Sequence, residues 1–122
     1  MTGFTGRLLL KCVYKLSKGE NVILIVSCPQ VAQKELNRLI RICEVTFGDL
    51  KDESIIKEVK KYNLSAKNGG NIIIVPTNHN IMCVMKAKTI HHAYIDNSVD
   101  ERLKPKIYGF FYDRGLTPDM ID

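Results

Sequence analysis

Three short apolar segments, at residues 21–27, 71–75 and 90–95, are the clearest pattern in the chain. None of them alternates apolar with polar residues. Strands that lack this alternation are usually covered on both faces, as in parallel sheets. The pattern therefore predicts three buried strands.

Apolar residues around these strands recur every three or four positions, which is the spacing of one face of a helix. The pattern predicts a first helix from about Arg7 to Ser17, ended by Gly19. A second helix is predicted to start at Pro29 and to end before Gly48.

A third helix is predicted after a cap at Asp52 or Ser54. Its apolar positions have helical spacing, and its exposed face carries lysines. The apolar positions are Ile55, Ile56, Val59 and Tyr62.

The second half of the chain begins at a turn, Asn68-Gly69-Gly70. A short helix is predicted at 81–85. A last helical region is predicted from Ser98 or Asp100 to Gly115, broken or restarted at Pro105.

Strands that alternate with helices predict a single three-layer α/β domain over residues 1–122, with a small, mostly parallel sheet. The tail at 117–122 is predicted to be frayed. Three short strands leave exposed sheet edges, so self-association into a homo-oligomer is also expected.

Composition and charge agree with a compact domain, since 45% of the 122 residues are hydrophobic and 25% are charged. The longest apolar runs, 22–26 and 72–75, are too short to span a bilayer, and no secretory signal is recognised at the start. We therefore expect a cytoplasmic protein without membrane contact, or one in the host cytoplasm if it is viral. The net charge of +5 favours acidic partners, including DNA or RNA.

The four cysteines lie in or beside apolar segments, and no Cys-x-x-Cys pair occurs. We expect buried, reduced thiols rather than a zinc site. They are Cys12, Cys28, Cys43 and Cys83.

A glycine-rich segment, Gly3-Phe4-Thr5-Gly6-Arg7, runs into the first predicted helix. Small residues before a helix let backbone N–H groups approach a phosphate, and the helix dipole favours the anion. The alternative interpretation is that Thr5 caps the helix and binds nothing.

The third strand ends in Tyr94-Ile95-Asp96-Asn97. A carboxylate at the carboxyl end of a parallel strand can hold Mg²⁺ through water, which makes Asp96 a candidate metal ligand. Asn97 cannot serve as a general base. The alternative is that Asp96 starts a turn and that Asn97 or Ser98 caps the next helix.

In order and spacing, these motifs over residues 3–97 resemble helicase-like and terminase-like P-loop proteins, including small phage proteins. The resemblance implies a trimmed P-loop NTPase-like domain. If nucleotide binds, it implies contacts from Gly3, Thr5, Gly6, Arg7 and Asp96.

The departures from that family argue against hydrolysis. In the preferred register, Gly3-Phe4-Thr5, Phe4 stands where a P-loop has the phosphate-binding Lys. In the other register, Gly6-Arg7-Leu8, Arg7 supplies a cation but Leu8 lacks the metal-binding hydroxyl. Asn97 stands where the family has Glu. A P-loop also follows a buried strand, and no such strand is expected before Gly3. No catalytic residue and no cofactor are therefore expected, and Mg-ATP is the alternative cofactor.

Two groups of basic residues form a candidate surface for nucleic acid or a partner. Their alternative role is ordinary solvated helix surface, because Glu35, Glu44, Glu53 and Glu58 are interleaved with them. The two groups are Lys34, Arg38 and Arg41 on the second helix, and Lys57, Lys60 and Lys61 on the third.

Three histidines occur, at His79, His91 and His92. The adjacent pair lies on a strand, where successive side chains face opposite sides, so these two cannot easily share one metal. Structural roles are the expected interpretation.

The sequence thus favours a non-enzymatic accessory protein of a virus or mobile element. It would bind a host or viral protein, for example as an inhibitor of a defence system, or nucleic acid. The alternatives are a nucleotide-binding protein or weak ATPase, and a basic nucleic-acid-binding module.

Overall fold

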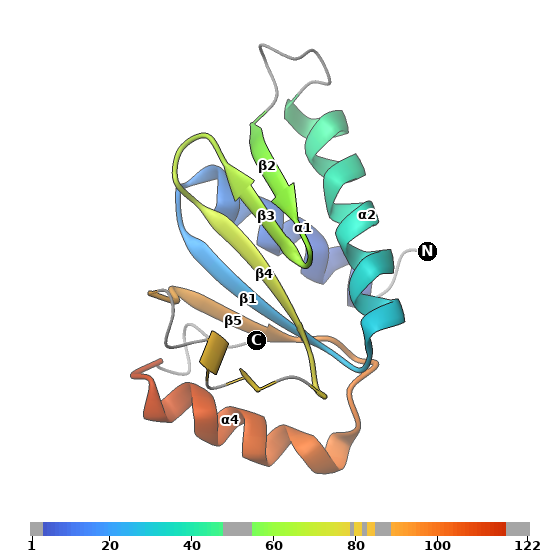
Figure 1. The fold of residues 1–122 in the computed structure, drawn as a ribbon, viewed down its shortest axis with the longest axis vertical. Helices are drawn as coiled ribbons and strands as arrows, with labels where there is room; N and C mark the ends of the chain where they lie inside the picture. The colour runs from blue at the N-terminus through green and yellow to red at the C-terminus, as the bar shows by residue number, and fades with distance from the viewer. Residues whose placement is uncertain (1–3, 48–54, 79, 82, 85–88, 117–122) are drawn as a thin grey trace.

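In the computed structural model, residues 4–47, 55–78, 80–81, 83–84 and 89–116 are described. They form an α/β fold with a five-stranded mixed sheet (Figure 1). The strands are β1 (Asn21–Val26), β2 (Ile56–Lys60), β3 (Asn63–Ala66), β4 (Asn71–Pro76) and β5 (His92–Ile95).

The helices are α1 (Phe4–Ser17), α2 (Pro29–Phe47) and α4 (Lys104–Asp113). A 3₁₀ helix, η1 (Glu101–Leu103), immediately precedes α4. Ile81, Cys83 and Val84 are also helical, which agrees with the short helix expected there.

The strand order is β2-β3-β4-β1-β5. The three predicted strands are confirmed, and they are parallel, with β1 between β4 and β5. Leu24 of β1 lies level with Ile74 on one side and with Tyr94 on the other.

The third predicted helix is wrong, because this segment is an antiparallel hairpin of β2 and β3 that pairs with β4. Its apolar residues have helical spacing in β2 only by coincidence. The strand signal lies just after them, where buried Leu64 and Ala66 alternate with half-buried Asn63 and Ser65. The sheet is therefore mixed rather than mostly parallel.

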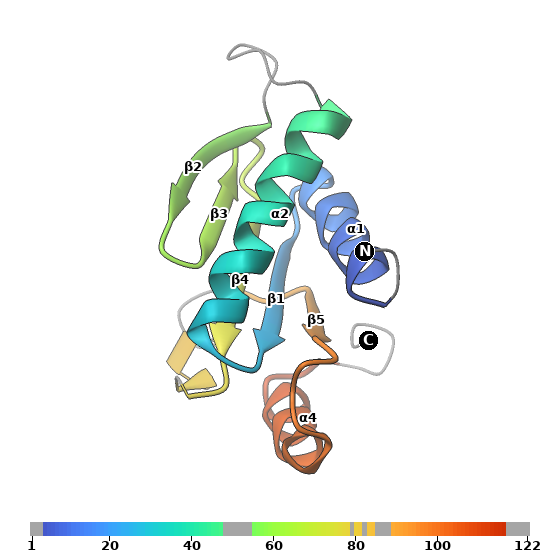
Figure 2. The same cartoon turned by 90° about the vertical axis from the view of Figure 1, so that its right-hand side faces the viewer.

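The core forms two clusters that share β1. Val22, Leu24 and Val26 belong to a cluster with α1 and α2, and the alternate residues Ile23 and Ile25 belong to one with α4. Figure 2 shows α1 and α2 beside each other and α4 away from both. Burial of both sets of side chains explains why β1 is apolar without alternation.

The predicted end of the first helix is confirmed, whereas its predicted start near Arg7 with Thr5 as a cap is wrong, because α1 begins at Phe4. Gly19 ends α1 with a φ of +79°, a conformation that glycine adopts without strain. Asp100 caps η1, since its Oδ1 accepts a hydrogen bond of 2.9 Å from the Arg102 backbone N–H. Pro105 lies in the first turn of α4, so the proline marks a helix start.

Candidate functional site at the carboxyl ends of the parallel strands

The chain after β1, β4 and β5 meets at one edge of the sheet, and hydrogen bonds join the three ends. The Thr77 hydroxyl donates to the Ser27 carbonyl over 3.0 Å, and the Thr77 N–H donates to the Val26 carbonyl over 2.9 Å. The Ser27 N–H donates to the Ser98 hydroxyl over 3.3 Å. Ligands of open α/β sheets bind at this edge, so it is the candidate site.

Asp96 directly follows β5, the outer strand on this side of the sheet, and is only 2% exposed. Its N–H donates to the Ile25 carbonyl, its Oδ2 accepts from the Ser98 N–H over 3.2 Å, and its carbonyl accepts from the Val99 N–H. The residue therefore starts a turn, as the structural alternative predicted. The cap of the following helix is Asp100 rather than Asn97 or Ser98.

Glu35 is a second buried acid beside this edge, and the sequence reasoning missed it. It lies on α2 with 2% exposure, and its Oε1 is 3.3 Å from Nη1 of Arg38. Burial raises the pKa of Glu35, the Arg38 charge opposes this shift, and the negative charge of Asp96 adds to it. The sequence does contain a sign of this burial, because Glu35 lies three or four positions from buried residues of α2. The buried apolar residues of this helix are Ala32, Leu36, Leu39 and Cys43.

Cys28 lies at the start of α2 and is half-buried. The backbone N–H of Val31, then the Ser27 hydroxyl and the Gln30 N–H, lower the pKa of the Cys28 thiol by stabilising its thiolate. The Ser27 hydroxyl is 3.8 Å from the sulfur. This thiol is therefore more acidic than an ordinary cysteine.

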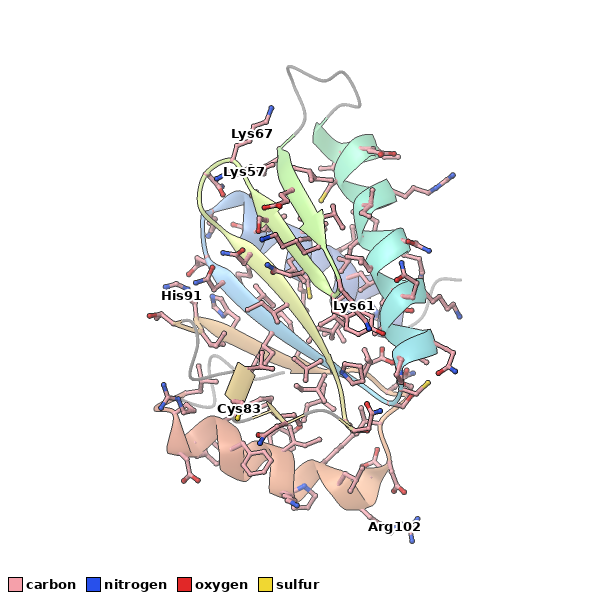
Figure 3. All side chains as sticks on the ribbon, in the orientation of Figure 1. Lys57, Lys61, Lys67, Cys83, His91 and Arg102 are labelled. Carbon is pink, nitrogen blue, oxygen red and sulfur yellow. The ribbon has the colours of Figure 1, made fainter. Side chains whose placement is uncertain are left out.

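The expectation of four buried thiols is only partly confirmed. All four cysteines are free, and Cys12 and Cys43 are buried. Burial raises the pKa of Cys43 to about 11 and that of Cys12 still further. Cys83, labelled in Figure 3, is exposed, which corrects the prediction, and the nearby Ile81 is buried instead.

The amino-terminal segment differs from the predicted loop. Helix α1 begins at Phe4, so Thr5 and Gly6 lie within its first turn rather than before it. Arg7 is exposed on the same helix. Gly3 lies outside the described residues. The nucleotide-binding role of these residues remains a prediction.

The six predicted basic residues do not share two helix faces. Lys57 and Lys60 lie on β2, and Lys61 lies in the turn that follows, because the segment is a hairpin. Figure 3 shows Lys57 near one end of this hairpin and Lys61 near the other.

Neighbouring acids partly offset the positive charge of this surface. Arg38 on α2 pairs with Glu35, and Lys60 lies 3.8 Å from Glu58. Lys34 and Arg41 are exposed on α2. The predicted patch is therefore mixed in charge.

The histidine pair lies at the opposite edge of the sheet, where the parallel strands begin. The Asn21 N–H donates to Nδ1 of His91 over 2.9 Å, and Nε2 of His92 is 3.2 Å from Oε2 of Glu20. His91 therefore satisfies the backbone N–H of Asn21, the first residue of β1, in agreement with a structural role. His79 lies outside the described residues.

A cavity of about 380 Å³ lies beside Thr77, between the segment after β4 and α4. Its wall combines amide side chains with apolar ones. The lining residues are Thr77, Asn78, Asn80, Ile81, Leu103, Lys106, Ile107 and Phe110.

Within the described part of the chain, no three His, Cys, Asp or Glu side chains are grouped to hold a metal ion. Asp96 as a metal ligand remains a prediction. The helices of the described residues include none with the length and apolar character needed to cross a bilayer.

Comparisons with models of known protein families, with curated proteins and with solved structures found no match for this chain.

Proposed function

We propose that this chain is a non-enzymatic accessory protein of a virus or mobile element that acts by binding a macromolecular partner. Its scaffold would be a trimmed, three-layer P-loop-like domain. The observation that carries the proposal is the state of Asp96, which is 2% exposed and whose carboxylate accepts the Ser98 N–H. The viral setting rests on the resemblance alone.

Hydrolysis of a nucleotide needs a carboxylate that reaches the metal and a base that orients water. The Asp96 carboxylate is engaged in its own turn, and Asn97 carries an amide that cannot accept a proton at neutral pH. Both features support binding without chemistry.

The partner would be a host or viral protein, or a nucleic acid, and the site of action would be the cytoplasm. β2 and β5 are the outer strands of the sheet among the described residues, so each offers backbone groups for strand addition. Exposed large apolar side chains occur on several elements, among them Val45 at 80%. Such side chains support contact with another macromolecule or with a second copy.

The second candidate function is nucleotide binding. The observation that favours it is the hydrogen-bonded chain that joins Thr77, Ser27, Ser98 and Asp96 at the edge where α/β sheets bind ligands.

Thermal unfolding with and without millimolar Mg-ATP separates the two candidates. The proposed function predicts an unchanged melting temperature. Ligand at about 100 times its Kd would add about 2.7 kcal/mol to the free energy of unfolding, which raises the melting temperature by several degrees.

Asp96→Asn is the informative variant, because it removes the charge but keeps an oxygen that can accept the Ser98 N–H. Asp100→Asn, at an exposed acid in the next turn, is its control. Stabilisation by Mg-ATP that Asp96→Asn abolishes and Asp100→Asn retains would contradict the proposal. Affinity capture from the native host should recover the same partner with the wild-type chain and with Asp96→Asn.

A further inference from the structure

The outward side of α1 carries basic residues without any acid. Arg7, Lys11 and Lys18, just past the helix end, are exposed, and Lys15 is half-buried. The helix Phe4–Ser17 contains no Asp or Glu. The opposite side is fixed in the core by Leu8, Leu9, Cys12, Val13 and Leu16.

Two large side chains lie exposed among these cations. Leu10 is 56% exposed and Tyr14 is 57% exposed. Nζ of Lys18 is 4.5 Å from the centre of the Tyr14 ring, and Nζ of Lys15 is 5.8 Å from it. We refer to Arg7, Leu10, Lys11, Tyr14, Lys15 and Lys18 together as the α1 face.

The acid nearest in sequence to this face is already engaged. Oε2 of Glu20 lies 3.2 Å from Nε2 of His92. Among the described residues, no ion pair involves Arg7, Lys15 or Lys18, whereas Arg38 on α2 pairs with Glu35. Within the described part of the chain, the charges of Arg7, Lys15 and Lys18 are therefore not offset by an ion pair, whereas that of Arg38 is.

The spacing of the charges is regular. Arg7, Lys11 and Lys15 are four residues apart, which is about 6 Å along a helix. From Arg7 to Lys18 the row covers about 16 Å. A row of evenly spaced cations complements the repeating phosphates of a nucleic-acid strand.

The aromatic ring gives the face a second kind of contact. Proteins that bind single strands combine a positive track with aromatic side chains on which bases stack. Tyr14 lies within the row of cations, where an unpaired base next to bound phosphates can reach it.

We propose that the α1 face binds single-stranded nucleic acid, with phosphates at Arg7, Lys11 and Lys18 and a base stacked on Tyr14. This inference rests on the proposed function, that the chain acts by binding a macromolecule. It names the partner as nucleic acid and places the contact on a surface separate from the carboxyl edge of the sheet.

The test measures fluorescence anisotropy of labelled DNA and RNA single strands of about 20 nucleotides at about 50 mM and about 200 mM salt. The double variant Lys11→Glu with Lys18→Glu is compared with Lys34→Glu with Arg41→Glu on α2. All four residues are exposed, and both variants change the net charge equally.

We expect wild-type binding to weaken with salt and the α1 variant to lose about tenfold or more in affinity. The α2 variant should lose much less. Equal losses in both variants would overturn the inference, since net charge alone would then explain binding. Absence of binding at low salt would overturn it as well, while a partner captured from the host would leave the proposed function intact.

Tyr14 separates stacking from charge. Tyr14→Ala should weaken binding about fivefold or more, and Tyr14→Phe should retain it, because both Tyr and Phe present a ring. Equal affinity of all three chains would overturn the stacking contact. Equal binding of duplex DNA, or full competition by poly-glutamate at matched charge, would overturn single-strand recognition in favour of a general site for acidic partners.

Discussion

The parallel strands and the β2–β3 hairpin belong to one sheet but differ in how much of each strand is buried. In β1 every residue from Val22 to Val26 is buried, whereas in β2 every residue from Lys57 to Lys60 is exposed. A strand buried on both faces has no alternative to an apolar sequence. An exposed outer strand can carry almost any sequence, including one with helical spacing.

The difference extends to function. The parallel strands bring Ser27, Thr77 and Asp96 together at one edge. The hairpin spreads its lysines along an exposed strand. The candidate site therefore depends on the parallel strands, and the hairpin can change in sequence with little effect on that site.

Truncation of a side chain in each region should give the largest contrast. Leu24→Ala in β1 removes a side chain with no exposed surface and should lower the free energy of unfolding by about 2–5 kcal/mol. Val59→Ala in β2, at a position 41% exposed, should cost less than about 1 kcal/mol. Urea denaturation of the two variants measures both values.

Similar losses for Leu24→Ala and Val59→Ala would contradict the comparison. They would mean that the outer strand is covered in solution, for example by a second copy, and the oligomeric state of the chain would then show which surface covers it.

The parallel strands were predictable because their burial leaves a mark in local sequence. The runs at 21–27 and 71–75 match β1 and β4 to within one residue. The end of α1 before Gly19 and the start of α4 at Pro105 also follow from backbone chemistry. The hairpin was not predictable in this way, because its position depends on pairing with β4, which lies outside the hairpin itself. In addition, its turn residue Tyr62 has a φ of +61°, which is unusual for an aromatic residue.

The candidate site was predictable only in part. Asp96 stands out because it ends an apolar strand. The charge of Glu35 predicts a surface position, although its spacing on α2 is that of the core and the residue is buried. The α1 face does not stand out in the sequence for a related reason, since Arg7 also ends the glycine-rich segment that predicts a phosphate loop.

The joint between the hairpin and the parallel strands gives the next contrast. A Cβ on Gly70 would lie 2.9 Å from the Leu16 carbonyl oxygen and 3.0 Å from that of Glu20, and both contacts are with backbone. Gly70→Ala should therefore destabilise the chain by about 1–3 kcal/mol. Gly109→Ala, with open space in the interior of α4, should stabilise it by about 0.5–1 kcal/mol. Thermal unfolding of both variants shows whether their changes in stability have opposite signs. A stabilising Gly70→Ala would mean that the backbone around Gly70 shifts to accept the added Cβ.

The smallest contrast lies within β3, where two polar residues differ in their partners. Oδ1 of Asn63 is buried without a hydrogen-bond partner among the described residues, whereas the Ser65 hydroxyl donates to Oδ1 of Asn71 over 2.9 Å. Asn63→Val removes a desolvated acceptor and should stabilise the chain by about 1 kcal/mol, and Ser65→Val breaks a hydrogen bond and should destabilise it by about 1 kcal/mol. Chemical denaturation resolves this difference in sign. If Asn63→Val instead destabilises the chain, the amide oxygen has a partner such as an ordered water, and the hairpin is held in place by more than its ladder with β4.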